Sequence, residues 1–194
     1  MSVFLATLPP EFVARMHRLL GDEFSDFYAA PPRRGLRVNT TVIDSDTVTK
    51  RLPFALAPAP FAENGFFADG DQKVGAHPLH HAGGFYMQEP SAQSAVTALA
   101  VKPGETVLDT CAAPGGKTTD ILSRIPDDSL LVTNEVMRGR ATILAENVAK
   151  WGRANVLVTN NDPADFKGLD SWFDFVLVDA PCSGEGMFRK DDEA

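Results

Sequence analysis

The sequence predicts an α/β protein, with a Rossmann-like parallel sheet in the second half of the chain and a small α+β domain before it. Short apolar segments alternate with segments of helical periodicity in that second half. The apolar segments are nearly continuous, which is typical of strands buried on both faces of a parallel sheet. The expected strands lie within residues 105–112, 130–136, 155–160 and 173–180, and the helices between them within 118–125 and 138–152.

The point where this pattern begins divides the chain into two expected domains. Residues 1–85 form an N-terminal domain with a linker, and residues 86–194 form a partial Rossmann-like domain. Apolar residues at positions 12, 13, 16, 19 and 20 have the spacing of an amphipathic helix. Alternating apolar residues predict a strand from Leu36 to Val42. Residues 55–85 lose this periodicity and are expected to form loops and short strands.

The net charge of the chain limits how it could bind a nucleic acid. The formal net charge is -8, so a nucleic-acid partner would have to be held by a local basic patch rather than by overall basicity. Arg33, Arg34 and Arg37 are the candidates for that patch, although a solvated face would have the same composition. The sequence has neither a run of about 18 apolar residues nor a signal peptide, so we expect no membrane contact and a cytoplasmic location.

The cysteines and histidines do not indicate a metal. Cys111 and Cys182 are the only cysteines, and they fit neither a disulfide framework nor a zinc spacing. The histidines at positions 77, 80 and 81 have no cysteine beside them and match no standard site. We therefore expect no bound metal.

The segment VLDTCAAPGGKTTDIL at 107–122 predicts a ligand site. An apolar strand runs into a loop with Gly115 and Gly116 and then into a helix, and ligands of parallel sheets bind at the carboxyl ends of the strands. The paired glycines allow close backbone approach at a helix N-terminus. A P-loop nucleotide phosphohydrolase is the alternative, but Cys111 occupies the position of its first glycine.

Acidic residues follow three expected strands: Asp109, Glu135 and Asp162. Glu135 lies 19 residues beyond Gly116, a spacing suited to ribose hydroxyls. Three carboxylates would repel a polyphosphate but suit a ligand with hydroxyls, an amine and a sulfonium. S-adenosyl-L-methionine is such a cofactor.

The last expected strand runs into DAPCSGEGMFRKD. A Pro-Cys pair at the carboxyl end of a strand beside the cofactor suits methylation of cytosine C5, because that carbon becomes nucleophilic only after a thiolate adds at C6. From spacing alone, Cys182 would be the attacking thiol; an inert cysteine in a tight loop is the alternative.

The chain resembles the Nop/Sun family of RNA cytosine-5 methyltransferases, and within it the bacterial RsmF-like enzymes of 16S ribosomal RNA. The matching phrases are GLRVNT, FYMQEPSAQ, LDTCAAPGGKT and VDAPCSGEGMFRKD, which span residues 35–191. The resemblance implies a SAM-dependent methyltransferase fold in which the loop 112–117 embraces the methionine part of the cofactor. The implied cofactor-binding residues are Ala112, Ala113, Pro114, Gly115, Gly116, Lys117, Glu135, Arg140, Asp162 and Asp179.

The resemblance also implies catalytic roles. Asp179 would face the target cytosine, Lys117 would lie close to both reactants, and Cys182 would assist release of the methylated product. The attacking thiolate of the family comes from a Thr-Cys motif on the next strand, whereas the only such dipeptide here is Thr110-Cys111. We therefore expect a chain truncated after the fourth strand and inactive alone.

The implied function of the whole enzyme is transfer of a methyl group from S-adenosylmethionine to C5 of a cytidine in ribosomal RNA. The N-terminal domain would pack on the catalytic domain and help to hold the RNA. A non-catalytic RNA-binding module is the second alternative.

Overall fold

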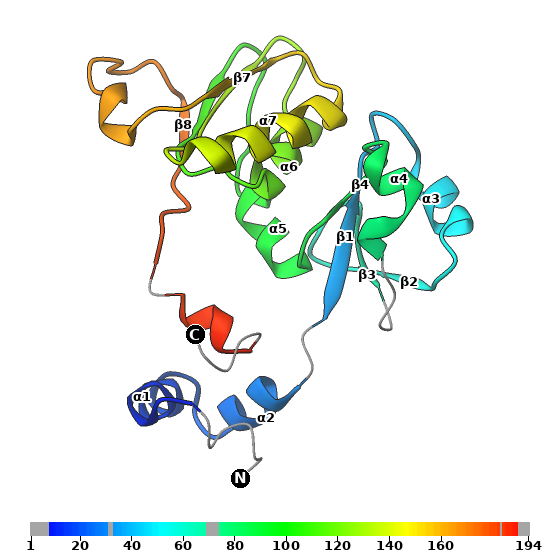
Figure 1. Cartoon of the computed structure of the whole chain (residues 1–194), viewed down its shortest axis with the longest axis vertical. Coiled ribbons are helices and arrows are strands. Elements are labelled where there is room, and N and C mark those ends of the chain that lie inside the picture. Colours follow the sequence, from blue (N-terminus) through cyan, green and yellow to red (C-terminus); the bar gives the residue numbers. More distant parts are fainter. Residues whose placement is uncertain (1–7, 31–32, 69–73, 183, 190–194) are drawn as a thin grey trace. The chain divides into compact units, whose positions relative to one another are not determined.

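The computed structural model describes residues 8–30, 33–68, 74–182 and 184–189 (Figure 1). Contacts divide the chain into two units. The first unit joins the N-terminal segment Met1–Pro32 to the C-terminal segment Pro181–Ala194, and the second unit comprises Arg33–Ala180. None of the helices in the described part combines the length and apolar composition needed to cross a bilayer.

The first unit is a small helical cluster. Its elements are α1 (Pro10–Leu20), α2 (Glu23–Ala29) and the 3-10 helix η4 (Glu185–Arg189). Phe12 packs edge-to-face on Phe24 and on Phe188, with ring centroids 6.0 and 5.2 Å apart, so aromatic contacts join the two ends of the chain. The amphipathic helix predicted around residues 12–20 is confirmed as α1, whereas α2 was not predicted.

An antiparallel sheet with strand order β2-β3-β1-β4 begins the second unit. Its elements are β1 (Arg34–Val38), α3 (Ser45–Arg51), β2 (Leu56–Pro58), β3 (Gly65–Ala68), η2 (Val74–Ala76), α4 (Pro78–His81) and β4 (Phe85–Met87). Leu36, Arg37 and Val38 are all buried. Because successive side chains of a strand point to opposite faces, β1 is covered on both sides. Leu36 and Val38 contribute to an apolar core, and Arg37 points to the opposite face.

A parallel sheet with strand order β7-β6-β5-β8 follows. Its elements are α5 (Pro90–Thr97), β5 (Thr106–Asp109), α6 (Gly116–Arg124), β6 (Leu130–Asn134), α7 (Arg138–Trp151), β7 (Val156–Thr159), η3 (Pro163–Phe166) and β8 (Phe175–Leu177). The four predicted strands and the helices between them are confirmed. Since β5 pairs with both β6 and β8, the strand order reverses at β5, and the loops after β5 and β8 lie side by side.

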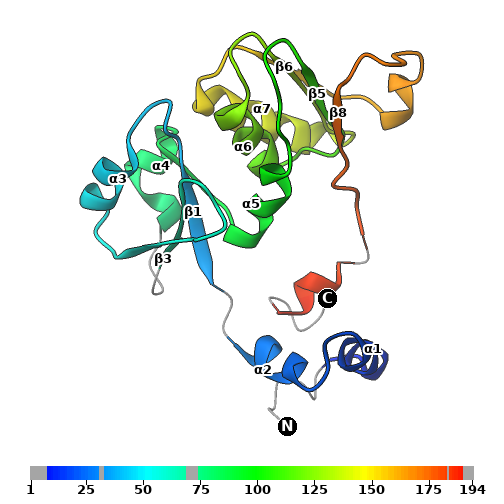
Figure 2. The same cartoon turned by 180° about the vertical axis from the view of Figure 1, so that it is seen from behind.

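Helices α6 and α7 lie on the same face of the parallel sheet, behind β5, β6 and β8 in the view of Figure 2. The opposite face is open at its outer strands, where Leu157 and Val176 are 53 and 54% exposed, whereas Leu108 and Val132 of the central strands are buried. The expectation that both faces are covered therefore holds for the central strands but is wrong for the outer strands β7 and β8. Its physical reason is that β7 is followed by the short η3 rather than by a helix long enough to cover the strands.

The two sheets meet through polar and backbone contacts. The buried Asn39 amide donates to the carbonyls of Gly83 and Trp151, which lie before β4 and at the end of α7 (3.0 Å each). Gly83 has φ +74°, and a Cβ at this position would overlap the carbonyl oxygen of Lys150. Only glycine therefore fits where this turn touches α7.

Gly83→Ala is expected to lower the free energy of unfolding by more than about 3 kcal/mol, because it adds a clash with rigid backbone to the strain of a positive φ. Gly104→Ala is the matched control: Gly104 has φ +82° but no atom within 4 Å of the added Cβ. The control should cost about 1–2 kcal/mol. Urea unfolding of both variants measures the difference, and equal losses would contradict the close contact with α7.

Candidate functional site

A cavity of about 210 Å³ opens at the reversal of strand order in the second unit. Its walls come from the end of β4, the tip of β5, the loop between β5 and α6, and the residues after β8. The lining residues are Tyr86, Met87, Gln88, Asp109, Cys111, Ala112, Ala113, Pro114, Gly116, Lys117 and Asp179. This is the place where parallel α/β sheets bind nucleotide-like ligands.

The loop 112–117 forms one wall of the cavity, as far as the first residues of α6. Gly115 has φ +112°, a conformation that favours glycine, and the Gly115 amide donates to the Ala112 carbonyl (2.9 Å). A Cβ on Gly116 would lie 3.4 Å from both Tyr86 and Gln88. The loop is therefore a tight turn whose backbone lies directly against Tyr86 of β4 and Gln88 just after it.

Two long side chains hold the loop from α7. Arg140 donates to the Ala113 carbonyl (2.6 Å), and Asn147 donates to the Pro114 carbonyl (2.8 Å). Arg140 also lies 3.6 Å from the carboxylate of Glu135, at the tip of β6. The predicted residue Arg140 thus reaches the loop, and Glu135 contacts Arg140; neither lines the cavity.

Lys117 and Asp179 meet at the cavity. The Lys117 ammonium lies 2.6 Å from the Asp179 carboxylate. Because the Asp179 side chain is more than half exposed, solvent screening limits the stabilisation from this pair to about 1 kcal/mol or less. Lys117 and Asp179 could therefore each bind a ligand group instead of one another with little loss of stability.

Asp109 is the buried acid of the cavity. Burial raises its pKa to about 6, although the hydrogen bond from the Thr118 hydroxyl (2.8 Å) and nearby Lys117 favour the charged form. Its Oδ1 atom makes no hydrogen bond of ordinary geometry among the described residues, and the Cys111 backbone amide gives only a small contribution that favours the charged form. An uncompensated carboxylate oxygen in a cavity wall suits a ligand that carries a proton donor or a positive charge.

The other two strand-tip acids already have backbone partners. Glu135 is buried, and its carboxylate accepts from the Met137 amide (3.0 Å). Asp162 is exposed and accepts from the Ala164 amide (2.8 Å) at the start of η3. Between these tips, the buried Asn134 donates to the carbonyls of Thr110 and Asn161 and so fixes the ends of three strands relative to one another.

The basic cluster is only partly at the surface. Arg33 and Arg34 are exposed, and the Arg33 guanidinium lies over the ring of Phe67, 3.6 Å from its centroid. Arg37 is 1% exposed, so the expectation that it belongs to an RNA-binding patch is wrong. The reason is strand alternation: Arg37 points from β1 toward α6, where it is enclosed.

One predicted site residue remains, and the cavity also contains residues that were not predicted. Cys182 is exposed and belongs to the first unit, and its catalytic role stays a prediction. Sequence reasoning did not assign Tyr86, Met87 and Gln88 to the cavity. In the sequence, the phrase FYMQEP carries only the family resemblance. Its position just before the parallel sheet is the signal that places these residues beside the glycine loop.

Two family models match the chain. The first, the N-terminal domain of 16S rRNA methyltransferase RsmF, matches residues 8–90, and the second, 16S rRNA methyltransferase RsmB/F, matches residues 96–194. The chain belongs to the RsmB/F family of 16S rRNA methyltransferases. The resemblance to RNA methyltransferases inferred from the sequence motifs is confirmed.

Curated relatives of the RsmB/F family agree. The "Ribosomal RNA small subunit methyltransferase F" of Vibrio cholerae is 40% identical over 97% of this chain, and that of Erwinia tasmaniensis is 39% identical over 96%. The chain covers 43 and 42% of their lengths. It therefore spans less than half of the relatives it matches.

Solved structures confirm the methyltransferase fold expected for an RsmB/F protein. A methyltransferase homolog protein from Pyrococcus horikoshii superposes with a TM-score of 0.82 at 28% identity, over 98% of this chain and 67% of its own. NSun6 from the same organism, solved with SFG, has a TM-score of 0.80 at 17% identity, over 92% of this chain and 72% of its own, and supports the fold alone.

Asp109 should make stability depend on pH. The folded chain keeps the Asp109 proton up to about pH 6, whereas an ordinary aspartate releases it near 3.8, so the folded state binds more protons between these values. The contribution of Asp109 therefore falls as pH rises through this window, by about 3 kcal/mol in total. Asp109→Asn should gain stability relative to wild type as pH rises from 4 to about 7.

Urea unfolding of both proteins at several pH values measures this difference. The two stabilities should lie closest near pH 4, separate progressively up to about pH 6, and keep a constant difference above pH 7. A separation that does not depend on pH would show that Asp109 titrates normally.

Proposed function

We propose that the protein containing these residues transfers a methyl group from S-adenosylmethionine to C5 of a cytidine in small-subunit ribosomal RNA. Membership of the RsmB/F family supports the substrate class. The choice of S-adenosylmethionine as cofactor rests on the cavity at the strand reversal, where a buried carboxylate oxygen of Asp109 makes no hydrogen bond of ordinary geometry among the described residues.

The residues around the cavity fit this cofactor. Asp109 would accept the cofactor's ammonium group, and the loop 112–117 would hold its methionine part against Tyr86 and Gln88. Glu135 would bind the ribose hydroxyls and Asp162 the adenine, after giving up the backbone contacts that they make here. When bound, the cofactor supplies an electrophilic methyl group on a positively charged sulfur.

Charge favours this cofactor over a nucleotide triphosphate. Asp109 and Asp179 face the cavity with Lys117, so two carboxylates stand against one cation. A triphosphate would bring further negative charge to this pair, whereas a sulfonium and an ammonium are attracted by it. The loop also carries Cys111 where a P-loop has its first glycine.

The catalytic proposal assigns three side chains. Asp179 hydrogen-bonds the edge of the target cytosine, and Lys117 holds the Asp179 carboxylate in place, as their 2.6 Å contact allows. Cys182 assists release of the methylated base. The target base must be exposed, in a loop or by flipping, to enter the cavity.

Arg33 and Arg34 are proposed to contact the RNA. Both are exposed at the start of β1, and arginine pairs well with phosphate oxygens. Arg33 already lies on Phe67, so this pair also offers a flat surface on which an unpaired base can stack. A non-catalytic RNA-binding module would use the same residues but would not need the cavity.

Disruption of the gene that encodes this chain is expected to remove 5-methylcytosine from small-subunit ribosomal RNA. Bisulfite sequencing measures the modification at each cytidine. The wild-type gene should restore it, and the Asp179→Asn gene should not, because the amide cannot replace the carboxylate facing the cytosine.

The control for this experiment is Asp170→Asn, an exposed aspartate that does not line the cavity and should restore methylation fully. An unchanged methylation pattern after disruption would refute the proposed activity. Full restoration by Asp179→Asn would refute only the role of Asp179.

A further inference from the structure

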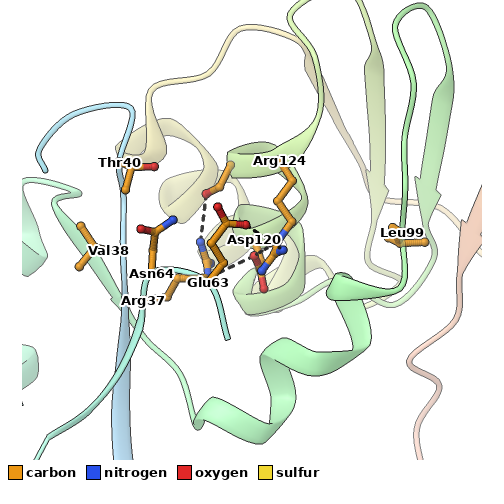
Figure 3. Close-up of a pocket in the computed structure, with 9 residues that line it drawn as sticks. Arg37, Val38, Thr40, Glu63, Asn64, Leu99, Asp120 and Arg124 are labelled. Atoms are coloured by element: carbon orange, nitrogen blue, oxygen red, sulfur yellow. Dashed lines mark hydrogen bonds and ion pairs between the residues drawn. The ribbon is translucent and has the colours of Figure 1, made fainter. Parts of the chain in front are cut away.

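Arg37 is the only fully buried basic side chain among the described residues. It lies on β1, is 1% exposed, and spans the junction between the antiparallel sheet and α6 (Figure 3). Burial lowers its pKa to about 10, so the guanidinium remains charged at neutral pH. A buried charge persists only where strong partners compensate for its lost hydration.

All five N–H donors of Arg37 have acceptors. Nε donates to the Gln88 side chain (3.3 Å), and one terminal nitrogen donates to the Thr119 carbonyl and the Ser123 hydroxyl (3.2 and 3.1 Å). The other terminal nitrogen donates to the Gly116 carbonyl and the Thr119 hydroxyl (3.1 and 2.7 Å). The ring of Trp151 lies against the guanidinium, 4.7 Å from its carbon.

The nearby carboxylate of buried Asp120 favours the charged form of Arg37, but it does not account for the direction of the Arg37 hydrogen bonds. Arg37 Nε lies 3.7 Å from Asp120, beyond hydrogen-bond length, whereas Arg124 donates to the same oxygen at 2.7 Å. Asp120 thus has a closer cation on its own helix. The hydrogen bonds of Arg37 go instead to Gly116 and Thr119 in the first turn of α6, to Ser123 near its end, and to Gln88.

These acceptors control the wall of the proposed cofactor cavity. The Thr119 hydroxyl that accepts from Arg37 donates to the Gly115 carbonyl (2.7 Å), which the Thr119 backbone amide also bonds (2.9 Å). Arg37 thus adds a direct bond to the Gly116 carbonyl and, through Thr119, a second bond to the Gly115 carbonyl. In a trans peptide the N–H points opposite to the carbonyl. Arg37 therefore fixes the amide directions of Gly116 and Lys117, both of which line the cavity, as does Gln88.

We propose that Arg37 is a positioning residue, which sets the cofactor loop and Gln88 in their binding geometry without touching the cofactor. The inference rests on the proposed function, because the cavity must be the S-adenosylmethionine site. It makes the N-terminal sheet part of the cofactor site: β1 supplies the group that shapes a loop of the parallel sheet.

Titration calorimetry of the 194-residue chain with S-adenosylhomocysteine tests the proposal. Arg37→Lys keeps the charge but has three donors instead of five, and it is expected to raise Kd at least about tenfold, the effect of losing a buried hydrogen bond to a charged group. Thr119→Val is a milder variant that keeps the guanidinium and removes the hydroxyl that accepts from Arg37 and donates to the Gly115 carbonyl, and it should raise Kd about threefold. Each protein is measured well below its unfolding midpoint.

Asn39→Ser is the matched control. Asn39 is also buried on the junction and bonds the carbonyls of Gly83 and Trp151, but it makes no contact with the loop 112–117. This variant should unfold at a lower temperature with Kd unchanged within about twofold. Hydrogen exchange in the unliganded chain should show the amides of 115–118 less protected in the Arg37 and Thr119 variants only.

The outcomes separate the two proposals. If the unaltered chain does not bind S-adenosylhomocysteine, the cofactor assignment fails and this inference fails with it. If the unaltered chain binds and Arg37→Lys and Thr119→Val bind equally well, Arg37 is only a structural junction residue. An equal rise in Kd for Asn39→Ser would lead to the same conclusion.

Discussion

Parallel pairing of β5 with a neighbour on each side is the constraint on which the site depends. It brings the carboxyl ends of β5 and β8 to one edge of the sheet, so that Asp109 and Asp179 face one cavity although they are 70 positions apart. Burial at this edge removes water from Asp109 and leaves one of its oxygens without a hydrogen bond of ordinary geometry among the described residues. The same topology that forms the cavity thus leaves a buried carboxylate in its wall.

The loop 112–117 has little regular structure of its own and takes its shape from neighbours. Arg140 and Asn147 hold its carbonyls from α7, and Arg37 holds its last residues from β1. The energetic cost of enclosing a guanidinium is offset by five hydrogen bonds, four of them to α6. The antiparallel sheet is therefore tied to the cofactor loop itself rather than joined to it by a linker.

Local patterns were sufficient to predict the parallel sheet and the position of the glycine loop. Four apolar segments separated by helical periodicity leave few alternatives, and ligand binding at strand ends follows from topology.

The sequence pattern failed where burial depends on distant residues. Arg37 looked like a surface arginine beside Arg33 and Arg34, because three neighbouring arginines give no sign that one of them points toward α6. The contacts of Arg37 with Gly116 and Thr119, which only the structure shows, are what distinguish it from Arg34. Gln88 was missed for the same reason, since its partners lie in another sheet and helix.

The most direct measurement of the central claim is a crystal structure of this chain with S-adenosylhomocysteine. The account predicts the homocysteine part over the loop 112–117, with its ammonium within hydrogen-bond distance of Asp109 and its ribose at Glu135. A ligand bound elsewhere, for example in the cavity of about 290 Å³ beside Arg37 and Arg124, would contradict it.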